Sequence, residues 1–209
     1  MDNLIIALTG PSGAGKTTLS DRLVLEDNFY VPTHTTTRKR RSDDSDNLYR
    51  YFSHESFRNE VLLNNFLFWS GDSDIIDKRY GNYYGLLKKD FYDASFHDRL
   101  IFYISYKDIE TILSLKNAGL NIEIVNLLYR NLRESMVMRL IGNERNHTPE
   151  EIKNRIVCAE DYEMKFRKIL DSHDVLKIYT DVYNKEETYN IVKTRKLKWG
   201  NYYGILGFV

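Results

Sequence analysis

The segment Gly10-Pro11-Ser12-Gly13-Ala14-Gly15-Lys16-Thr17 decides the fold of this chain. It matches the pattern G-x-x-x-x-G-K-[ST] at every fixed position, and it follows a short apolar run, Leu4 to Thr9. Behind it, Leu19, Leu23 and Leu25 recur at roughly helical spacing. A strand, a glycine-rich turn and a helix in this order are the context that a phosphate-binding loop requires. We therefore predict an α/β fold that opens with such a loop.

The glycines of this loop let the backbone curl until its N–H groups converge on phosphate oxygens, and the following helix adds partial positive charge. We expect Lys16 to reach the β- and γ-phosphates of ATP and Thr17 to offer its hydroxyl to Mg²⁺. The alternative is a chance glycine-rich turn, which the flanking strand and helix disfavour. The predicted ATP-binding residues are Gly10, Pro11, Ser12, Gly13, Ala14, Gly15, Lys16, Thr17 and Thr18.

Composition narrows the class of protein. The 209 residues suffice for one well-buried domain, and 30 basic side chains balance 30 acidic ones. Zero net charge argues against a dedicated nucleic-acid or membrane-surface binder. A single cysteine, Cys158, excludes an internal disulfide, and the apolar run at 4–8 is too short for a signal sequence. We expect a soluble cytoplasmic protein, monomer or homodimer, that binds neither nucleic acid nor membranes.

Apolar runs alternate with helical patterns over most of the chain. Strands are predicted at 100–104, 121–128 and 175–179, and helices at 107–117, 130–140, 149–170 and 185–193. Thr148-Pro149-Glu150-Glu151 has the composition of a helix start. Continuous apolar runs are typical of strands buried in a parallel sheet. This pattern predicts a central parallel sheet flanked by helices.

Residues 30–96 interrupt the alternation and are rich in Tyr, Asp, Ser and Arg. We interpret them as a lobe inserted into one domain, 1–209, whose core comprises 1–29 and 97–209. Within this lobe, Gly81-Asn82-Tyr83-Tyr84-Gly85 recurs as Gly200-Asn201-Tyr202-Tyr203-Gly204. Coincidence or local packing explains the repeat more simply than mimicry of the first copy.

The inserted lobe carries a dense cationic segment, Thr35 to Arg41. Asp43, Asp44 and Asp46 follow almost directly and cancel the field that would attract a nucleic acid. A pocket for one compact dianion fits better than a solvated loop. Arg38 and Arg41 can bind phosphate oxygens bidentately, and Tyr49 can add a hydroxyl donor.

Taken in order along the chain, these motifs resemble the guanylate kinase family. They are the phosphate-binding loop, T-T-R-x-x-R at Thr36–Arg41, the Y-x-F-like piece Tyr49–Ser53, G-N-Y-Y-G at Gly81–Gly85 and an arginine-bearing segment, Arg139–Arg155. The resemblance implies a P-loop kinase fold with an acceptor-binding lobe and a helical lid at 139–155. It also implies ATP-dependent phosphoryl transfer to a nucleoside monophosphate, with GMP or dGMP as the default acceptor.

The resemblance also assigns roles to individual residues. Arg38, Arg41, Tyr49 and Tyr84 would hold the acceptor's phosphate. The lid would close over ATP, and its arginines would stabilise the charge that develops on the transferred group. The implied catalytic residues are Lys16, Arg38, Arg139, Arg145 and Arg155.

The chain departs from the family at the positions that read guanine. The family uses a Glu, a Ser or Thr and an Asp, whose aligned positions here are Phe68, Leu86 and Ser105, and His34 stands where the family has Ser. These four residues complete the predicted acceptor site. Apolar side chains leave the N–H and O groups of guanine unpaired. The carboxylates that could replace the missing Asp in its Mg²⁺-water role are Asp72, Asp74 and Asp108.

Three alternatives stay open from the sequence. The departures resemble those of ribose 1,5-bisphosphate phosphokinases, or the acceptor is another nucleotide whose base stacks on Phe68 and Trp69. A non-catalytic binding module of this fold is the third, and the presence of Lys16, Thr17 and the lid arginines favours an enzyme over it. A P-loop GTPase or motor is disfavoured because no N-K-x-D-type motif is present.

Overall fold

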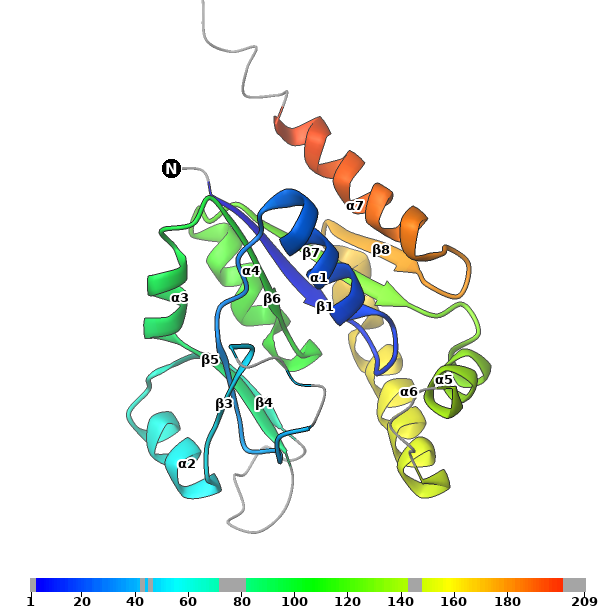
Figure 1. The fold of residues 1–209 in the computed structure, drawn as a ribbon, viewed down its shortest axis with the longest axis horizontal. Helices are drawn as coiled ribbons and strands as arrows, with labels where there is room; N and C mark the ends of the chain where they lie inside the picture. The colour runs from blue at the N-terminus through cyan, green and yellow to red at the C-terminus, as the bar shows by residue number, and fades with distance from the viewer. Residues whose placement is uncertain (1–2, 42–43, 45–46, 72–81, 143–147, 201–209) are drawn as a thin grey trace, which may run out of the picture. The chain divides into compact units, whose positions relative to one another are not determined.

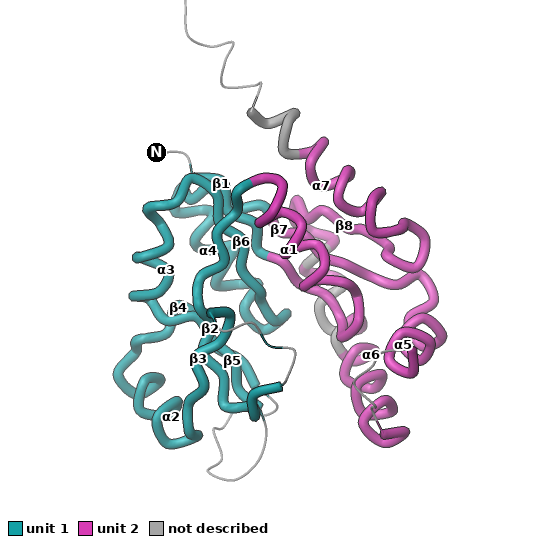
Figure 2. Tube along the Cα trace, in the orientation of Figure 1, with its two compact units in different colours: residues 1–7, 28–123 teal, residues 8–27, 124–209 magenta. Residues whose placement is uncertain are grey.

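A computed structural model describes residues 3–41, 44, 47–71, 82–142 and 148–200, without the side chains of 162, 165–167, 170 and 196–200. The chain divides into two compact units (Figure 2). Unit 1 comprises residues 1–7 and 28–123, and unit 2 comprises 8–27 and 124–209. Unit 1 is thus larger than the predicted lobe at 30–96, because the segment after the lobe packs against the lobe's strands. The division into core, lobe and lid stays a prediction.

The predicted α/β class is confirmed by a central parallel sheet flanked by helices (Figure 1). Its strand order is β6-β1-β7-β8, with β1 at Leu4–Thr9, β6 at Arg99–Tyr103, β7 at Ile122–Leu128 and β8 at Val175–Tyr179. β7 and β8 pair in parallel, from Ile124 opposite Val175 to Leu128 opposite Tyr179. The continuous apolar runs gave these strands to within about one residue, since strands buried on both faces need no polar alternation.

Unit 2 contains α1 at Lys16–Asp27, α5 at Leu132–Ile141, α6 at Pro149–Ser172 and α7 at Lys185–Gly200. The predicted start of α6 is confirmed, because Thr148 and Glu151 cap each other's backbone N–H groups. In α1, Leu19 and Leu23 are buried as expected. Leu25, the third leucine at roughly helical spacing, does not share their face, since its side chain is 82% exposed. Two residues turn a helix by about 200°, which places Leu25 opposite Leu23.

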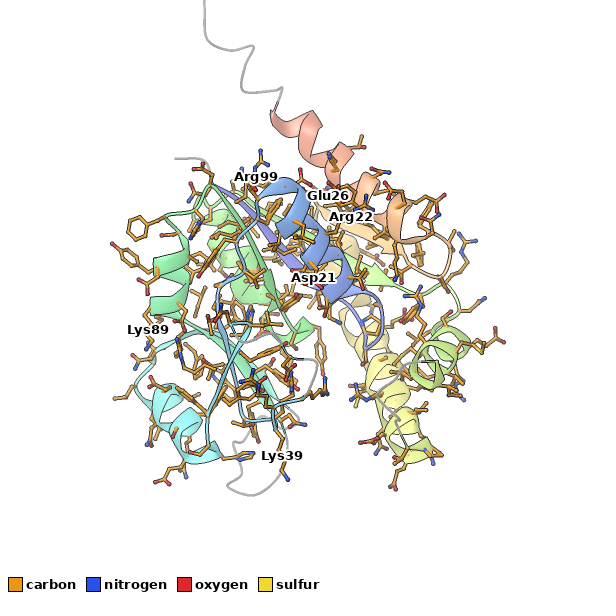
Figure 3. All side chains as sticks on the ribbon, viewed as in Figure 1. Asp21, Arg22, Glu26, Lys39, Lys89 and Arg99 are labelled. Atoms are coloured by element: carbon orange, nitrogen blue, oxygen red, sulfur yellow. The ribbon has the colours of Figure 1, made fainter. Side chains whose placement is uncertain are left out.

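Helix α1, which begins at Lys16, is anchored to α7 through its second half. Arg22 pairs with Glu26 at 2.7 Å and with Glu186 at 2.6 Å, and its guanidinium lies 3.9 Å above the ring of Tyr189. Figure 3 labels Arg22 and Glu26 on this helix. Tyr189 in turn donates to the buried Asp27 at 2.7 Å. The end of α1 that carries the phosphate-binding loop therefore belongs to a well-anchored helix.

Unit 1 contains a second sheet of order β3-β2-β5-β4. The strands are β2 at His34–Thr36, β3 at Tyr49–Tyr51, β4 at Phe66–Gly71 and β5 at Tyr83–Leu87. β2 runs parallel to β3 and antiparallel to β5. Segments far apart in the sequence, near residues 35, 50 and 84, therefore lie on neighbouring strands.

The described part of unit 1 also contains three α-helices and one 3₁₀ turn. They are α2 at His54–Leu62, α3 at Lys88–Ala94, the 3₁₀ turn η1 at Tyr106–Asp108 and α4 at Ile109–Asn117. A cluster of Phe57, Phe66, Tyr83 and Leu87 forms a core between α2 and the sheet. None of the helices in the described ranges combines the length and the apolar character needed to cross a membrane.

Candidate functional site

The backbone of the phosphate-binding loop adopts a shape that requires glycine. Gly10, Gly13 and Gly15 have φ angles of 139°, 79° and 90°, which L side chains rarely adopt. At Gly10 a Cβ atom would lie 2.3 Å from the carbonyl oxygen of Leu127, well inside van der Waals contact. The loop is therefore shaped by its glycines as the sequence pattern indicated.

Lys16 lies over this loop. Its Nζ donates to the carbonyl oxygens of Gly10 at 2.7 Å and Pro11 at 2.8 Å. Burial, together with the smaller effect of the nearby positive charge of Arg155, lowers the pKa of Lys16 to about 8. Thr17 and Thr18 are exposed on the first turn of α1. A phosphate bound in the loop would replace two neutral carbonyl partners of Lys16 with charged oxygens.

Two of the predicted lid arginines contact the same loop. Arg155 Nη1 donates to Ser12 Oγ at 2.6 Å, and Arg139 Nη1 donates to the Gly13 carbonyl at 3.2 Å. Arg139 also donates to the carbonyl of Thr180. The third predicted arginine, Arg145, lies outside the described residues. The structure thus brings Lys16, Arg139 and Arg155 together around one loop.

Sequence reasoning missed Tyr129, which touches both the loop and an arginine. Its hydroxyl donates to the Ser12 carbonyl at 3.4 Å, and its ring centre lies 5.2 Å from the Arg139 guanidinium. Burial raises the pKa of Tyr129 to about 12, so the phenol stays protonated near neutral pH. The available signal was its position directly after β7, because loops at the carboxyl ends of parallel strands form ligand sites.

A cavity of about 680 Å³ opens beside the loop within unit 2. It lies among the loop, α1, α5 and the start of α7, and its lining includes Gly13, Thr18, Arg139, Thr180, Tyr183 and Asn184. Such a volume lies within the range of about 300–1,000 Å³ that is usual for small-molecule sites. The cavity therefore offers room for the rest of a nucleotide whose phosphates lie on the loop.

In unit 1, the cationic segment is organised around Arg38. Its Nη1 and Nη2 donate to the two carboxylate oxygens of Asp44 at 2.7 Å and 2.6 Å. The same carboxylate accepts from the Tyr51 hydroxyl at 2.6 Å and from the backbone N–H of Arg41 at 2.8 Å. These donors, the Arg38 guanidinium above all, hold the pKa of Asp44 well below its usual range. Unit 1 therefore contains an anion site that already holds one carboxylate of the chain.

Three of the residues predicted to bind the acceptor's phosphate lie together here. The Arg38 guanidinium is 4.8 Å from the centre of the Tyr49 ring, and the rings of Tyr49 and Tyr84 are 6.5 Å apart. Burial raises the pKa of Tyr49, which keeps its hydroxyl protonated. Arg41 is half-buried and contributes its backbone N–H to Asp44.

His34 is buried beside this group with both ring nitrogens against backbone. Nδ1 lies 3.0 Å from the Pro32 carbonyl, and Nε2 accepts from the Tyr103 N–H at 3.2 Å. Burial lowers the pKa of His34 to about 4, so the ring is neutral at pH 7. Nδ1 then carries the proton. This geometry favours a structural role for His34, in which its ring links β2 to β6, over the predicted contact with the acceptor.

Phe68 and Leu86, predicted at the acceptor's base, are core residues of unit 1. Phe68 is 5% exposed with its ring 5.7 Å from that of Phe102, and Leu86 is fully buried. Both belong to paired strands, in which Phe68 is opposite Leu86. Their burial argues against direct contact with an acceptor in this conformation.

Ser105 caps the 3₁₀ turn and is only partly exposed. Its Oγ accepts from Lys107 N–H, and its own N–H donates to Asp108 at 2.8 Å. Asp108 is buried, which raises its pKa to about 7. Asp72 and Asp74, the other candidates to replace the missing carboxylate, lie outside the described residues. Within the described ranges, no group of three or more His, Cys, Asp or Glu side chains is placed to hold a metal ion.

The guanylate kinase family model matches residues 2–188 of the chain. Similar proteins include the guanylate kinase of Clostridium tetani, 31% identical over 157 residues, which are 74% of this chain and 62% of that relative. The chain thus spans less than two thirds of that relative's length. The guanylate kinase of Rickettsia prowazekii is 28% identical over 196 residues, covering 83% of this chain and 90% of the relative.

Among solved structures, the guanylate kinase of Anaplasma phagocytophilum aligns with a TM-score of 0.64 at 14% sequence identity. The alignment covers 94% of this chain and 85% of that one, which shows a shared fold.

Proposed function

The chain belongs to the guanylate kinase family, and we propose that it transfers the γ-phosphoryl group of ATP to the phosphate of a nucleoside monophosphate, with GMP or dGMP as the default acceptor. The observation that carries this proposal is the convergence of Lys16, Arg139 and Arg155 on one glycine-shaped loop. Phosphoryl transfer needs little covalent chemistry from a protein and depends on positioning and charge neutralisation. Three cations at one phosphate site supply the second of these requirements.

The shape of the loop supports the binding of the ATP phosphates. Gly10 packs so closely against the Leu127 carbonyl that no side chain fits at this position, and the Lys16 ammonium lies over the loop, on the Gly10 carbonyl. We propose that Gly10 to Thr18 bind the ATP phosphates. Thr17, exposed at the first turn of α1, would provide a hydroxyl ligand to Mg²⁺. When bound, Mg²⁺ neutralises charge on the phosphates.

The Arg38 site supports binding of the acceptor's phosphate. Arg38, Tyr49 and Tyr84 present one guanidinium and two phenols within a small space. We propose these three residues, with Arg41, as the phosphate ligands of the acceptor. Arg139, Arg155 and Arg145 would stabilise the negative charge on the transferred phosphoryl group. The oligomeric state, monomer or homodimer, and the cytoplasmic location stay predictions.

A second class of acceptor, such as ribose 1,5-bisphosphate, is favoured by the burial of Phe68 and Leu86. Neither side chain offers a polar group with which to select guanine, and a site without such groups discriminates weakly between bases. A non-catalytic binding module is disfavoured, because Lys16, Arg139 and Arg155 all contact the loop.

The test is a coupled ADP-release assay with ATP and Mg²⁺ across GMP, dGMP, dTMP, the other nucleoside monophosphates and ribose 1,5-bisphosphate. We expect turnover with one or a few acceptors and its loss in Lys16→Ala. Lys89→Ala is the matched control, since Lys89 is an exposed lysine on α3 (Figure 3), and we expect it to retain activity. Negligible turnover with every acceptor in the wild type would refute the kinase and favour a binding module.

A further inference from the structure

Arg38 is a buried cation whose charge is balanced inside unit 1. Its side chain is 7% exposed and that of Asp44 is 8% exposed. Removing a guanidinium from water is costly unless a hydrogen-bonded anion compensates for it. The two parallel bonds to Asp44 provide that compensation in the strongest geometry available to an arginine.

The pairing with Asp44 uses only one edge of the guanidinium. The group carries five N–H donors. Asp44 and the Lys39 carbonyl take both hydrogens of Nη1 and one of Nη2. The other two hydrogens, on Nε and Nη2, lie along a different edge. The Tyr49 hydroxyl also hydrogen-bonds to the Arg38 side chain, and two oxygens of one phosphate can replace this phenol and accept both hydrogens together. Asp44 therefore need not leave for a phosphate to bind Arg38.

Asp44 is itself fixed from two directions. The Tyr51 hydroxyl reaches it from β3, and the Arg41 N–H reaches it from its own segment. The Tyr51 ring also lies 5.9 Å from the Arg38 guanidinium. The orientation of Arg38 is consequently set before any ligand binds, through a carboxylate that is anchored to a strand.

We infer that Asp44 is a positioning residue of the acceptor site, which holds Arg38 with its second edge ready for the acceptor's phosphate. The inference rests on the proposed function, because it takes Arg38 as a phosphate ligand. A pre-oriented cation loses less side-chain freedom when a ligand binds. In this role Asp44 orients Arg38 and does not itself contact the acceptor.

The test compares variants by kinetics and by calorimetric titration with GMP, or with whichever tested acceptor gives the highest wild-type turnover. Asp44→Asn keeps the shape and removes the charge. We expect its acceptor KM and its acceptor Kd without ATP to rise about tenfold, while kcat and the KM for ATP stay within about twofold. Asp44→Glu retains the charge and is expected to recover part of the affinity.

The matched control is Asp90→Asn. Asp90 forms a second bidentate pair in unit 1, with Arg50 at 2.6 Å and 3.0 Å. Its loss removes a comparable ion pair without touching Arg38, and we expect acceptor KM to be unchanged. If Asp44→Asn does not fold, Tyr51→Phe removes one hydrogen bond to Asp44 and is expected to raise acceptor KM about threefold, because the carboxylate is less well anchored.

Several results separate this inference from the proposed function. An unchanged or lower acceptor KM and Kd in Asp44→Asn, or in Tyr51→Phe where only that variant folds, overturns the inference and leaves the kinase standing. A fall in kcat alone also overturns it. Acceptor binding without turnover in the wild type, weakened in Asp44→Asn, refutes the kinase and supports the inference. A wild type that neither binds nor phosphorylates any tested acceptor refutes both.

Discussion

The phosphate-binding loop of unit 2 and the Arg38 site of unit 1 are two anion sites built in opposite ways. The loop relies on backbone shape, and its main cation, Lys16, rests on the neutral carbonyls of Gly10 and Pro11. The Arg38 site relies on side chains, and its cation is paired with a full negative charge on Asp44. Neutral partners are exchanged more readily than a bidentate carboxylate. Lys16 can therefore exchange its carbonyl partners for the phosphate oxygens of a ligand, whereas Arg38 keeps its ion pair with Asp44.

This difference predicts different kinetic signatures for the two sites. Cations that meet the transferred group should act mainly on kcat, and cations that only hold the acceptor should act mainly on KM. In Arg139→Ala we expect kcat to fall by about 10³-fold, the low end of what an arginine at a phosphoryl group contributes. In Arg38→Ala we expect mainly a rise in acceptor KM. Steady-state kinetics at saturating ATP distinguishes the two, and the reverse pattern would break the comparison.

The loop's dependence on backbone shape gives the next largest effect. Gly10→Ala forces an L side chain into a positive φ and within 2.3 Å of the Leu127 carbonyl. We expect a loss of about 3 kcal/mol in the free energy of unfolding, combining backbone strain with overlap. Urea denaturation followed by circular dichroism measures it.

Gly119→Ala is the control for that change. Gly119 has a φ of 100° but nothing within 4 Å of the added Cβ. It should therefore cost only about 1 kcal/mol, from the backbone alone. Equal losses in the two variants would mean that the packing of Gly10 against Leu127 contributes nothing to the loop.

The contrast between the sites also explains which features the sequence could predict. The loop and its strand are local, so the spacing of Gly10, Gly15 and Lys16 predicted them closely. The Arg38 site depends on pairing between strands of three residues, β2 and β3, whose ends are set by their neighbours. From the sequence, Asp44 could be interpreted only as a negative charge that weakens the electrostatic field of the cationic segment. Its contact with Arg38 could not be predicted, because it depends on the path of the intervening turn.

The burial of Phe68 and Leu86 shows the same limit. β4 and β5 are paired with a register irregularity between Phe66 and Phe68. A shift of one residue in a strand moves every side chain to the opposite face. Alignment with the family therefore predicted that Phe68 and Leu86 contact the acceptor, whereas the register of β4 and β5 places both side chains in the core.

The position of Lys16 over neutral carbonyls predicts a pH dependence for ATP binding. Its pKa of about 8 means that the ammonium loses its proton as pH rises through 8. Bound phosphates favour the charged form, so ATP affinity should be constant below this value. Above it, affinity should fall by up to about tenfold per pH unit. Calorimetric titration with ATP between pH 7 and about 9.5 tests this, and Lys16→Ala should remove the dependence.

The smallest predicted effect concerns unit 1 and the buried Asp108. Burial raises its pKa to about 7 in the folded chain, above the value of about 4 for an exposed Asp. The folded state therefore binds more protons than the unfolded state between these two pKa values. The contribution of Asp108 to the free energy of unfolding consequently falls as pH rises through this window. From pH 6 to pH 8 we expect wild type to lose about 1 kcal/mol relative to Asp108→Asn. Measuring both chains by urea denaturation cancels the titration of His34, which is common to them. Parallel pH profiles for the two would show that Asp108 is ionised throughout, and that its hydrogen bond from Ser105 compensates for its burial.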